Sequence, residues 1–327
     1  MRHFFLGLVF LMLAGRAPAA ERFVFAALGC QPYARAGNSV ENYARLITEI
    51  NRANPVFTVH VGDFKGSEEP CTDELFLRRR AEFNTFTGPL IFTPGDNDWT
   101  DSHYLLAGRR DPLERLAKLR EVFFAGERSL GQQPLALVTQ RRDPAFAKYV
   151  ENARWTHGGV VFATVHIVGS DNNDQPTVPG AEAEFAERDA ASAAWIRAAF
   201  AAARATAAAG VVLFFQADPL GADFGQTGIA RGFGHFLRVL ADEARAWAKP
   251  VLLVHADEHR YRLDVGVQLL PDEPPLPNVT RLETFGDYNV HAVLVAVDPD
   301  SPQLFLCGPL IVPGNPRPFL PRPKKTP

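Results

Sequence analysis

The chain has 327 residues, a formal net charge of -3 at pH 7, 46% hydrophobic residues and 22% charged residues. These proportions are ordinary for a globular protein, and the length suits one large domain or two small ones. Because there is no basic excess, composition does not favour nucleic-acid binding. The cysteines Cys30, Cys71 and Cys307 are too few for a disulfide framework, although one pair can close in an oxidising compartment.

The N-terminus has the pattern of a secretory signal peptide. Arg2 and His3 precede the apolar run 4–15, which is followed by the A-x-A cleavage pattern Ala17-Pro18-Ala19. The apolar run is shorter than the ~20 residues that a membrane-spanning helix needs. We therefore expect a signal peptide at 1–20 and a periplasmic or secreted protein with no transmembrane segment after the signal. An uncleaved N-terminal anchor is the alternative.

Strands and helices are predicted to alternate along most of the chain. Apolar segments that favour strands are 22–29, 55–62, 89–93, 159–170, 211–216 and 251–256. Segments with helical periodicity or helix-forming composition are 38–53, 72–86, 111–124, 181–209 and 233–248. Four more short strands are predicted at 262–270, 278–286, 290–298 and 303–308. This order predicts an α/β sandwich of mixed sheets covered by helices.

One domain is predicted from residue 21 to residue 310. The segment 125–158 has weaker patterning and is interpreted as an insertion over the functional site. The tail 311–327 is rich in proline and basic, which predicts disorder.

Polar side chains follow several of the predicted strands. Asp63 and Asp96 follow two strands of the first half, Gln216 follows a third, and Asp257 and His259 follow a fourth. In open α/β sheets ligands bind beyond the carboxyl ends of the strands. Because several carboxylates in one place repel each other, a cation is their natural partner. For the stretch Pro94 to Asp98, an ordinary turn is the alternative, since Pro, Gly, Asn and Asp are all turn formers.

The order of these strand ends resembles the calcineurin-like metallophosphoesterase family. The family pattern runs D-x-H, then G-D, then G-N-H-[DE], then a lone His, then G-H-x-H. The corresponding stretches here are Cys30-Gln31-Pro32, Gly62-Asp63, Gly95-Asp96-Asn97-Asp98, Gln216 and Ala256-Asp257-Glu258-His259. The resemblance spans roughly residues 22 to 300 and implies a four-layer sandwich of two mixed β-sheets flanked by helices.

The resemblance also implies two adjacent metal sites that share Asp63. The first site would use positions 30 and 32, Asp63 and His259, but Cys30 and Pro32 replace the family's ligands there. The second would use Asp63 with Asp96, Gln216 and Asp257, all of which carry oxygen. Such ligands favour Mn²⁺, Mg²⁺ or Ca²⁺ over Zn²⁺ or iron. The sequence therefore indicates one oxygen-rich site, one incomplete site, and one or two divalent ions.

Asn97 stands where the family carries its catalytic imidazole. An amide donates a hydrogen bond to a leaving oxygen but does not deliver a proton at neutral pH. The resemblance implies metal-dependent hydrolysis of a phosphate ester, with a phosphorylated small molecule or another phosphoester as substrate. A catalytically inactive binding or scaffold protein on the same fold is the alternative.

Overall fold

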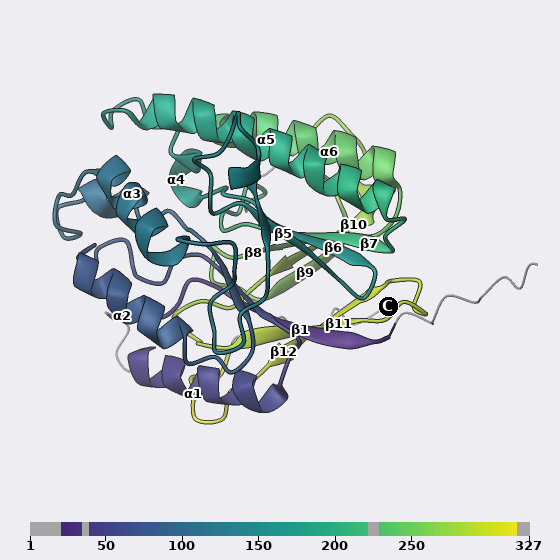
Figure 1. Ribbon diagram of the computed structural model, residues 1–327, viewed down its shortest axis with the longest axis horizontal. Coiled ribbons are helices and arrows are strands. Elements are labelled where there is room, and N and C mark those ends of the chain that lie inside the picture. Colours follow the sequence, from purple (N-terminus) through teal and green to yellow (C-terminus); the bar gives the residue numbers. More distant parts are fainter. Residues whose placement is uncertain (1–20, 35–38, 222–228, 319–327) are drawn as a thin grey trace, which may run out of the picture.

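Two mixed β-sheets face each other between two layers of helices (Figure 1). The computed structural model describes residues 21–34, 39–221 and 229–318. The signal peptide predicted at 1–20 lies outside the described residues. The two sheets and their flanking helices confirm the predicted four-layer α/β sandwich.

The first sheet has five strands in the order β12-β11-β1-β2-β3. Strands β1, β2 and β3 are parallel, and β11 and β12 extend the sheet in antiparallel fashion. The strands are β1 Phe23–Leu28, β2 Thr58–Val61, β3 Leu90–Thr93, β11 Ala292–Val297 and β12 Phe305–Leu310. The helices whose apolar side chains pack on its outer face are α1 Ser39–Ala53, α2 Asp73–Phe83 and α3 Pro112–Phe123.

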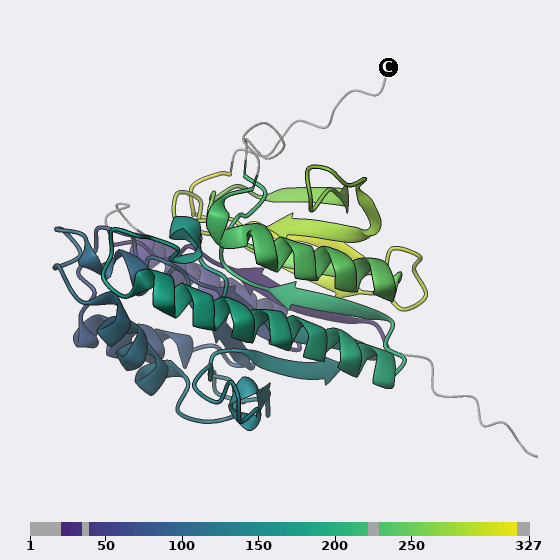
Figure 2. The ribbon, with the colours of Figure 1, turned by 90° about the horizontal axis from the view of Figure 1, so that it is seen from above.

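The second sheet has seven strands in the order β4-β5-β6-β7-β8-β10-β9. Its central strands β6, β7, β8 and β10 are parallel, and the outer strands are antiparallel. The strands are β4 Val138–Thr139, β5 Ala153–His157, β6 Val160–Thr164, β7 Gly210–Phe214, β8 Val251–His255, β9 Arg262–Val267 and β10 Leu276–Glu283. Helices α5 Ala181–Ala205 and α6 Gly234–Trp247 run side by side over this sheet (Figure 2).

The remaining short elements are η1 Thr100–His103, η2 Gln140–Arg142, η3 Arg231–Phe233 and the single turn α4 Gly169–Asn172. Although α4 is one helical turn by its hydrogen bonds, Ser170 and Asp171 have positive φ angles of 50° and 53°. It is therefore a left-handed turn. Side chains other than glycine adopt that conformation at a cost, and it recurs at functional sites.

The two sheets are joined by an aromatic core. Phe25 of the first sheet contacts Phe162 and Phe214 of the second edge-on, at 5.6 and 5.8 Å between ring centroids, and Phe57 contacts Trp155 in the same way at 5.4 Å. All five side chains are buried. Burial of large apolar rings is the main favourable term in folding, so this core holds the strand ends of both sheets in fixed relation.

Three details differ from the sequence-based expectations. The segment 125–158 does not lie over the site but supplies β4 and β5, the outer strands of the second sheet. The predicted strand 159–170 ends at Thr164. In the predicted tail, Asn315 is buried and donates to the carbonyl oxygens of Asn42 and Val290, so residues up to 318 contact the domain.

The three cysteines are free thiols. Across the residues the structure describes, no helix combines the length and apolar character needed to cross a bilayer.

Candidate metal centre

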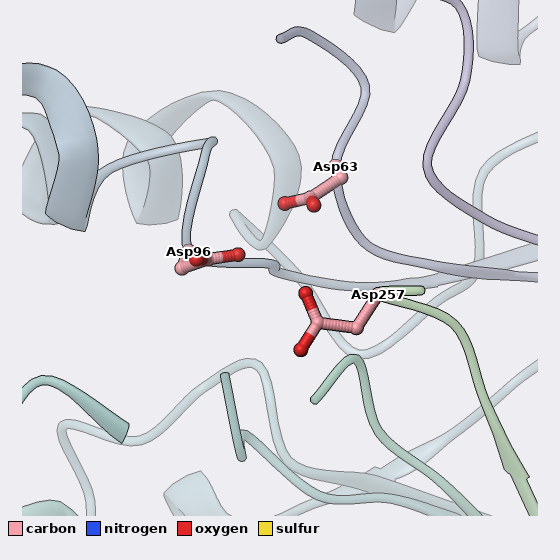
Figure 3. A group of neighbouring side chains, drawn as sticks. All are labelled: Asp63, Asp96 and Asp257. Carbon is pink, nitrogen blue, oxygen red and sulfur yellow. The ribbon is translucent and has the colours of Figure 1, made fainter. Parts of the chain in front are cut away.

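The carboxyl ends of four parallel strands meet between the two sheets. Asp63 follows β2 and Asp96 follows β3 in the first sheet, while Gln216 follows β7 and Asp257 follows β8 in the second. Asp63, Asp96 and Asp257 each offer a carboxylate oxygen, and these oxygens lie within 4.8 Å of one another. Figure 3 shows the three side chains directed toward a common space. The sandwich thus assembles three acidic groups that are far apart in the sequence.

The backbone around this centre is under local constraint. Cys30, Asp63, Asp257 and His259 all have positive φ angles, of 51°, 59°, 86° and 62°. Such angles are uncommon for residues other than glycine and persist only where the surroundings enforce them. The strand ends are therefore bent to aim these side chains rather than to continue the sheets.

Two glycines allow the loops after β2 and β3 to touch. A Cβ atom on Gly62, whose φ is +83°, would lie 2.5 Å from the backbone nitrogen of Gly95. A Cβ atom on Gly95 would lie 2.1 Å from Oδ1 of Asp63. A larger residue at either position would push Asp63 away from the centre, so these glycines are required by close approach.

Asp63 lies at the middle of a hydrogen-bond network and is 1% exposed. Its Oδ1 accepts from the backbone N–H of Asn97 at 3.0 Å. Its Oδ2 lies 3.0 Å from Nδ2 of Asn97, 3.2 Å from the hydroxyl of Tyr33 and 3.1 Å from Nε2 of Gln216. Asp63 is thus the group that links the two sheets at this edge.

Asp96 is buried with one carboxylate oxygen unsatisfied. Its Oδ2 accepts from the hydroxyl of Ser170 at 2.9 Å, but its Oδ1 has no hydrogen-bond partner among the described residues. The same hydroxyl lies 2.9 Å from Oδ1 of Asp101. A hydroxyl has one hydrogen, so it satisfies only one of these two carboxylates at a time. A buried acceptor without a partner is costly, and a bound cation removes that cost.

Gln216 presents its amide in a fixed orientation. Its Oε1 accepts from the backbone N–H groups of Gly169 at 2.6 Å and Asp96 at 3.4 Å. Its Nε2 therefore faces the carboxylates and donates to Asp63 at 3.1 Å and to Asp257 at 3.0 Å. In this arrangement the amide draws two acidic groups together by donation. The metal-ligand role suggested by the sequence stays a prediction, and it requires the amide oxygen to turn toward the centre.

Asp98 has a different role from Asp96, two positions earlier. Its Oδ2 accepts from the backbone N–H groups of Asp63 at 3.0 Å and Gly95 at 2.8 Å, and its Oδ1 accepts from Phe64 at 2.9 Å. Asp98 therefore ties the loop after β2 to the loop after β3. The stretch Pro94 to Asp98 is both a turn and a source of site residues, because Asp98 braces the turn while Asp96 faces the centre.

His259 stands apart from the three carboxylates. Its Nε2 lies 3.3 Å from the hydroxyl of Tyr33, and its Nδ1 lies 3.1 Å from Oδ1 of Asp287. Because the Tyr33 hydroxyl also contacts Asp63, it lies between two of the ligands that the sequence assigns to the first metal site. Asn97 donates from Nδ2 to the same hydroxyl at 3.0 Å. Tyr33 and Asn97 thus link Asp63 to His259 by hydrogen bonds.

Cys30 lies beside the centre as the resemblance implies. Its Sγ is 3.5 Å from Oδ2 of Asp63 and accepts from the backbone N–H of Asp257 at 3.2 Å. Burial and the neighbouring carboxylates of Asp63 and Asp257 raise the pKa of the Cys30 thiol, which keeps it protonated at neutral pH.

The electrostatics of the centre are dominated by burial and mutual repulsion of carboxylates. Burial, followed by repulsion from neighbouring aspartates, raises the pKa of Asp63 and of Asp96 well above the usual range. Burial also raises the pKa of Asp98 and of Asp257 to about 6. The nearby Lys65 ammonium lowers the pKa of Asp98, but it does not outweigh burial.

The centre opens into a cleft of about 480 Å³. Its acidic lining residues are Asp63, Glu68, Glu69, Asp96, Asp257 and Asp287, and no lysine or arginine of the described chain lines it. The other lining side chains include Tyr33, Asn97, His259 and Tyr288. An anionic substrate would be repelled from such a cleft unless cations neutralised it.

Sequence reasoning did not identify Tyr33, Ser170, Asp101 and Asp287 as parts of the centre. Tyr33 follows the end of β1 by five residues, and Asp287 follows the end of β10 by four. Their position after strand ends was a usable signal. Ser170 had no such signal, because the left-handed turn that brings it to Asp96 is set by tertiary contacts.

Comparisons with known proteins support the fold. No protein-family model and no curated protein matches the sequence. A dimetal phosphatase from Danio rerio superposes with a TM-score of 0.54 at 9% identity, covering 84% of this chain and 95% of that one. PhoD superposes with a TM-score of 0.51 at 11% identity, covering 86% of this chain and 65% of PhoD. The chain has the fold of the calcineurin-like metallophosphoesterases.

On this fold, the assembled carboxylates are consistent with a divalent metal site. The structure brings Asp63, Asp96, Asn97, Gln216 and Asp257 into direct or one-step contact. His259 joins them through Tyr33.

Proposed function

We propose that the protein is a divalent-cation-dependent phosphoesterase with a single oxygen-rich metal site formed by Asp63, Asp96 and Asp257. Two features of Asp96 carry this proposal: its buried Oδ1 has no hydrogen-bond partner among the described residues, and its carboxylate lies within 4.8 Å of those of Asp63 and Asp257. Three carboxylates without a paired lysine or arginine suit Mn²⁺, Mg²⁺ or Ca²⁺ better than Zn²⁺ or iron. When bound there, the cation would supply Lewis-acid polarisation and charge neutralisation for a phosphoryl group.

The side chains of this chain would hold and orient the substrate. Asn97 has an amide that lines the cleft, and its Nδ2 would donate to a phosphoryl or leaving oxygen by exchanging one of its hydrogen bonds to Tyr33 and Asp63. Tyr33 has a hydroxyl in the same cleft, and burial followed by the charge of Asp63 raises its pKa well above the usual value. It therefore stays protonated, donating its one hydrogen to Asp63 and accepting from Asn97. His259, linked to Asp287, would position the Tyr33 hydroxyl through its Nε2.

Turnover of phenyl phosphate with and without Mn²⁺ tests this proposal. We expect turnover in the parent only with the cation, and none above background in Asp96→Asn. Asp300→Asn is the control because that side chain is 80% exposed and pairs with Arg22, which is not part of the centre. Cation-independent turnover, or equal turnover in Asp96→Asn and the control, would contradict the proposal.

A binding or scaffold role on the same fold is the second candidate. The Tyr33 hydroxyl lies between Asp63 and His259, and the amide NH₂ group of Gln216 lies between Asp63 and Asp257. Internal donors therefore hold these acidic groups together without an ion, which favours a protein that keeps the fold but has lost turnover. Cation binding by the parent with no turnover of any aryl phosphate would favour this candidate.

We also propose that the protein is exported, on the basis of the N-terminal sequence. Intact mass of the protein recovered from a secreting host is expected to show loss of roughly the first 20 residues. A recovered protein that still begins at Met1 would contradict cleavage.

A further inference from the structure

A second cavity, of about 630 Å³, adjoins the acidic cleft and shares His259 with it. It is lined by the start of β9, the loop after β10 and the chain near residue 318. The lining residues are His259, Arg260, Tyr261, Arg262, Phe285, Asn289 and Pro318. The two spaces are therefore neighbours that share one lining side chain.

The second cavity has the opposite charge from the first. It contains two arginines and no carboxylate, whereas the acidic cleft contains six carboxylates and, within the described chain, no arginine or lysine. Arg262 is paired with Asp264 at 2.7 Å. The guanidinium of Arg260 has no carboxylate partner in the described part of the chain. Its charge is thus available to a ligand, and a guanidinium binds phosphate or carboxylate oxygens in a bidentate manner.

An aromatic pair forms one wall of this cavity. The rings of Tyr261 and Phe285 stack with centroids 5.1 Å apart and planes 16° apart. Phe285 is buried and also makes a T-shaped contact with His291, with ring centroids 5.4 Å apart. Tyr261 is half-buried, so it offers a supported flat surface on which a planar ring of a ligand can stack.

We propose that the second cavity holds the organic part of the substrate, and that this part carries a planar ring and a second anionic group, as a nucleotide does. This inference rests on the proposed function, which puts the reacting phosphoryl group in the acidic cleft. Arg260 directly follows His259, so their Cα atoms are ~3.8 Å apart. In this proposal a second phosphate, a few bonds from the first, binds Arg260 while the ring lies against Tyr261.

Titration calorimetry with a non-hydrolysable ligand tests the inference apart from turnover. The probe is α,β-methylene adenosine diphosphate in the presence of Mn²⁺, compared with methylenediphosphonate, which lacks the ring, and adenosine, which lacks the anions. We expect the complete probe to bind the parent more tightly than either part. Arg260→Gln should weaken it by about tenfold or more, since hydrogen bonds to charged groups are the strong ones.

Two further variants separate the contributions. Tyr261→Leu should weaken the complete probe while leaving methylenediphosphonate within about twofold, because only the ring contacts Tyr261. Arg80→Gln, an exposed arginine on α2 outside both spaces, is the matched control and should change nothing.

The outcomes distinguish this inference from the proposed function. If phenyl phosphate is hydrolysed but Arg260→Gln binds the complete probe as the parent does, the second cavity is not a substrate site and the proposed function stands. If phenyl phosphate is not hydrolysed but the complete probe binds in an Arg260-dependent manner, the cavity is a ligand site and the proposed turnover fails. Equal affinity of the parent for the complete probe and its parts would overturn the inference.

Discussion

Two regions of this protein bury carboxylates, and they do so in opposite ways. In the first, Glu151 is fully buried but accepts from Nε of Arg120 at 3.0 Å and lies 2.7 Å from Nδ1 of His166. In the second, Asp63 and Asp96 are buried beside further aspartates, with no arginine paired to either in the described chain. Burial alone raises the pKa of a carboxyl group in both regions.

The pKa values diverge because the partners differ. Around Glu151, burial is outweighed by the Arg120 charge and by His166, and the pKa falls well below the usual range. Around Asp96, burial and the neighbouring charges act in the same direction, and the pKa rises. A fold tolerates the second arrangement when the carboxyl groups stay protonated or when a bound cation supplies positive charge. The contrast therefore distinguishes carboxylates that are paired with cationic side chains from carboxylates that have no such partner, which is where a cation is proposed to bind.

The two regions are also connected. Arg188 donates from Nη1 to the carbonyl oxygen of His166 at 2.9 Å and to Oδ1 of Asn172 at 2.6 Å. Asn172 belongs to the left-handed turn that carries Ser170 to Asp96. The network that pairs Glu151 with cationic side chains (the compensated region) thus holds in place part of the aspartate site, whose carboxylates have no such partner (the uncompensated region).

Breaking the compensated region should have the largest effect on stability. Arg120→Leu would leave Glu151 buried with only His166 as a partner. Because an unpaired buried charge is costly, we expect the free energy of unfolding to fall by about 3–5 kcal/mol. Urea denaturation measures this, and Arg80→Leu should stay within ~0.5 kcal/mol of the parent. Equal midpoints for the two variants would show that Glu151 is not held by Arg120.

Removing one carboxylate from the uncompensated region should abolish the response to cations. At a Mn²⁺ concentration 100 times the dissociation constant, a bound cation stabilises the parent by about 2.7 kcal/mol. Asp96→Asn should lose that gain while unfolding no earlier than the parent when the cation is absent, because the substitution relieves repulsion. The measurement is the melting temperature with Mn²⁺ and with chelator. The same shift in Asp96→Asn and in the parent would return Asp96 to the role of a turn residue.

The pH dependence of stability should also differ in sign between the aspartate site and the region of Glu151. A carboxyl group whose folded-state pKa is raised stabilises the native state below its unfolded pKa, and this stabilisation is lost as pH rises through the folded value. For the metal-free protein, Asp98 and Asp257, both raised to about 6, put that loss between about pH 4 and pH 6. The slope is at most about 1.4 kcal/mol per pH unit for each proton released.

Glu151 acts with the opposite sign. Its lowered pKa contributes stability that is present above about pH 4.5, the unfolded value, and is lost as pH falls below it. Denaturant unfolding with chelator should therefore show stability declining from pH 4 to pH 6, and Mn²⁺ should reduce the decline by binding the ionised carboxylates. Stability that rises over this interval without a cation would contradict the conclusion that these aspartates are buried without a cationic partner.

The smallest effect is expected from Gln216→Glu. The change replaces the amide group that donates to Asp63 and Asp257 with another carboxylate. Without a cation, we expect a loss of about 1 kcal/mol or somewhat more, because two hydrogen bonds are replaced by repulsion. With Mn²⁺, the variant should show a larger increase in melting temperature than the parent. A variant that is destabilised equally with and without Mn²⁺ would place position 216 outside the cation site.

Much of the fold could be predicted because its signals are local. The apolar run before Asp63, the helical periodicity of 38–53 and the proline at the start of α3 each determine an element from neighbouring residues. The meeting of the strand ends also followed from the alternation of strands and helices, which puts the carboxyl ends of parallel strands together, but the order of the strands within each sheet was not predicted.

The details of the site were less accessible for a physical reason. Which end of the Gln216 amide faces Asp63 depends on the backbone N–H of Gly169, a residue 47 positions away in sequence. The position of the Tyr33 hydroxyl between Asp63 and His259 depends on three strand ends meeting. Such hydrogen-bond geometry arises only after the two sheets pack, so residue type and spacing cannot specify it.

The central claim is that Asp63, Asp96 and Asp257 form a divalent-cation site. Its most direct test is the Mn²⁺ content of the folded protein after equilibration and desalting, measured by elemental analysis. We predict about one ion per chain for the parent and for the Asp300→Asn control, and close to none for Asp96→Asn, because the parent offers the oxygen-rich ligand set that hard cations require. A parent that retains no ion, or an Asp96→Asn variant that retains as much as the parent, would contradict the account.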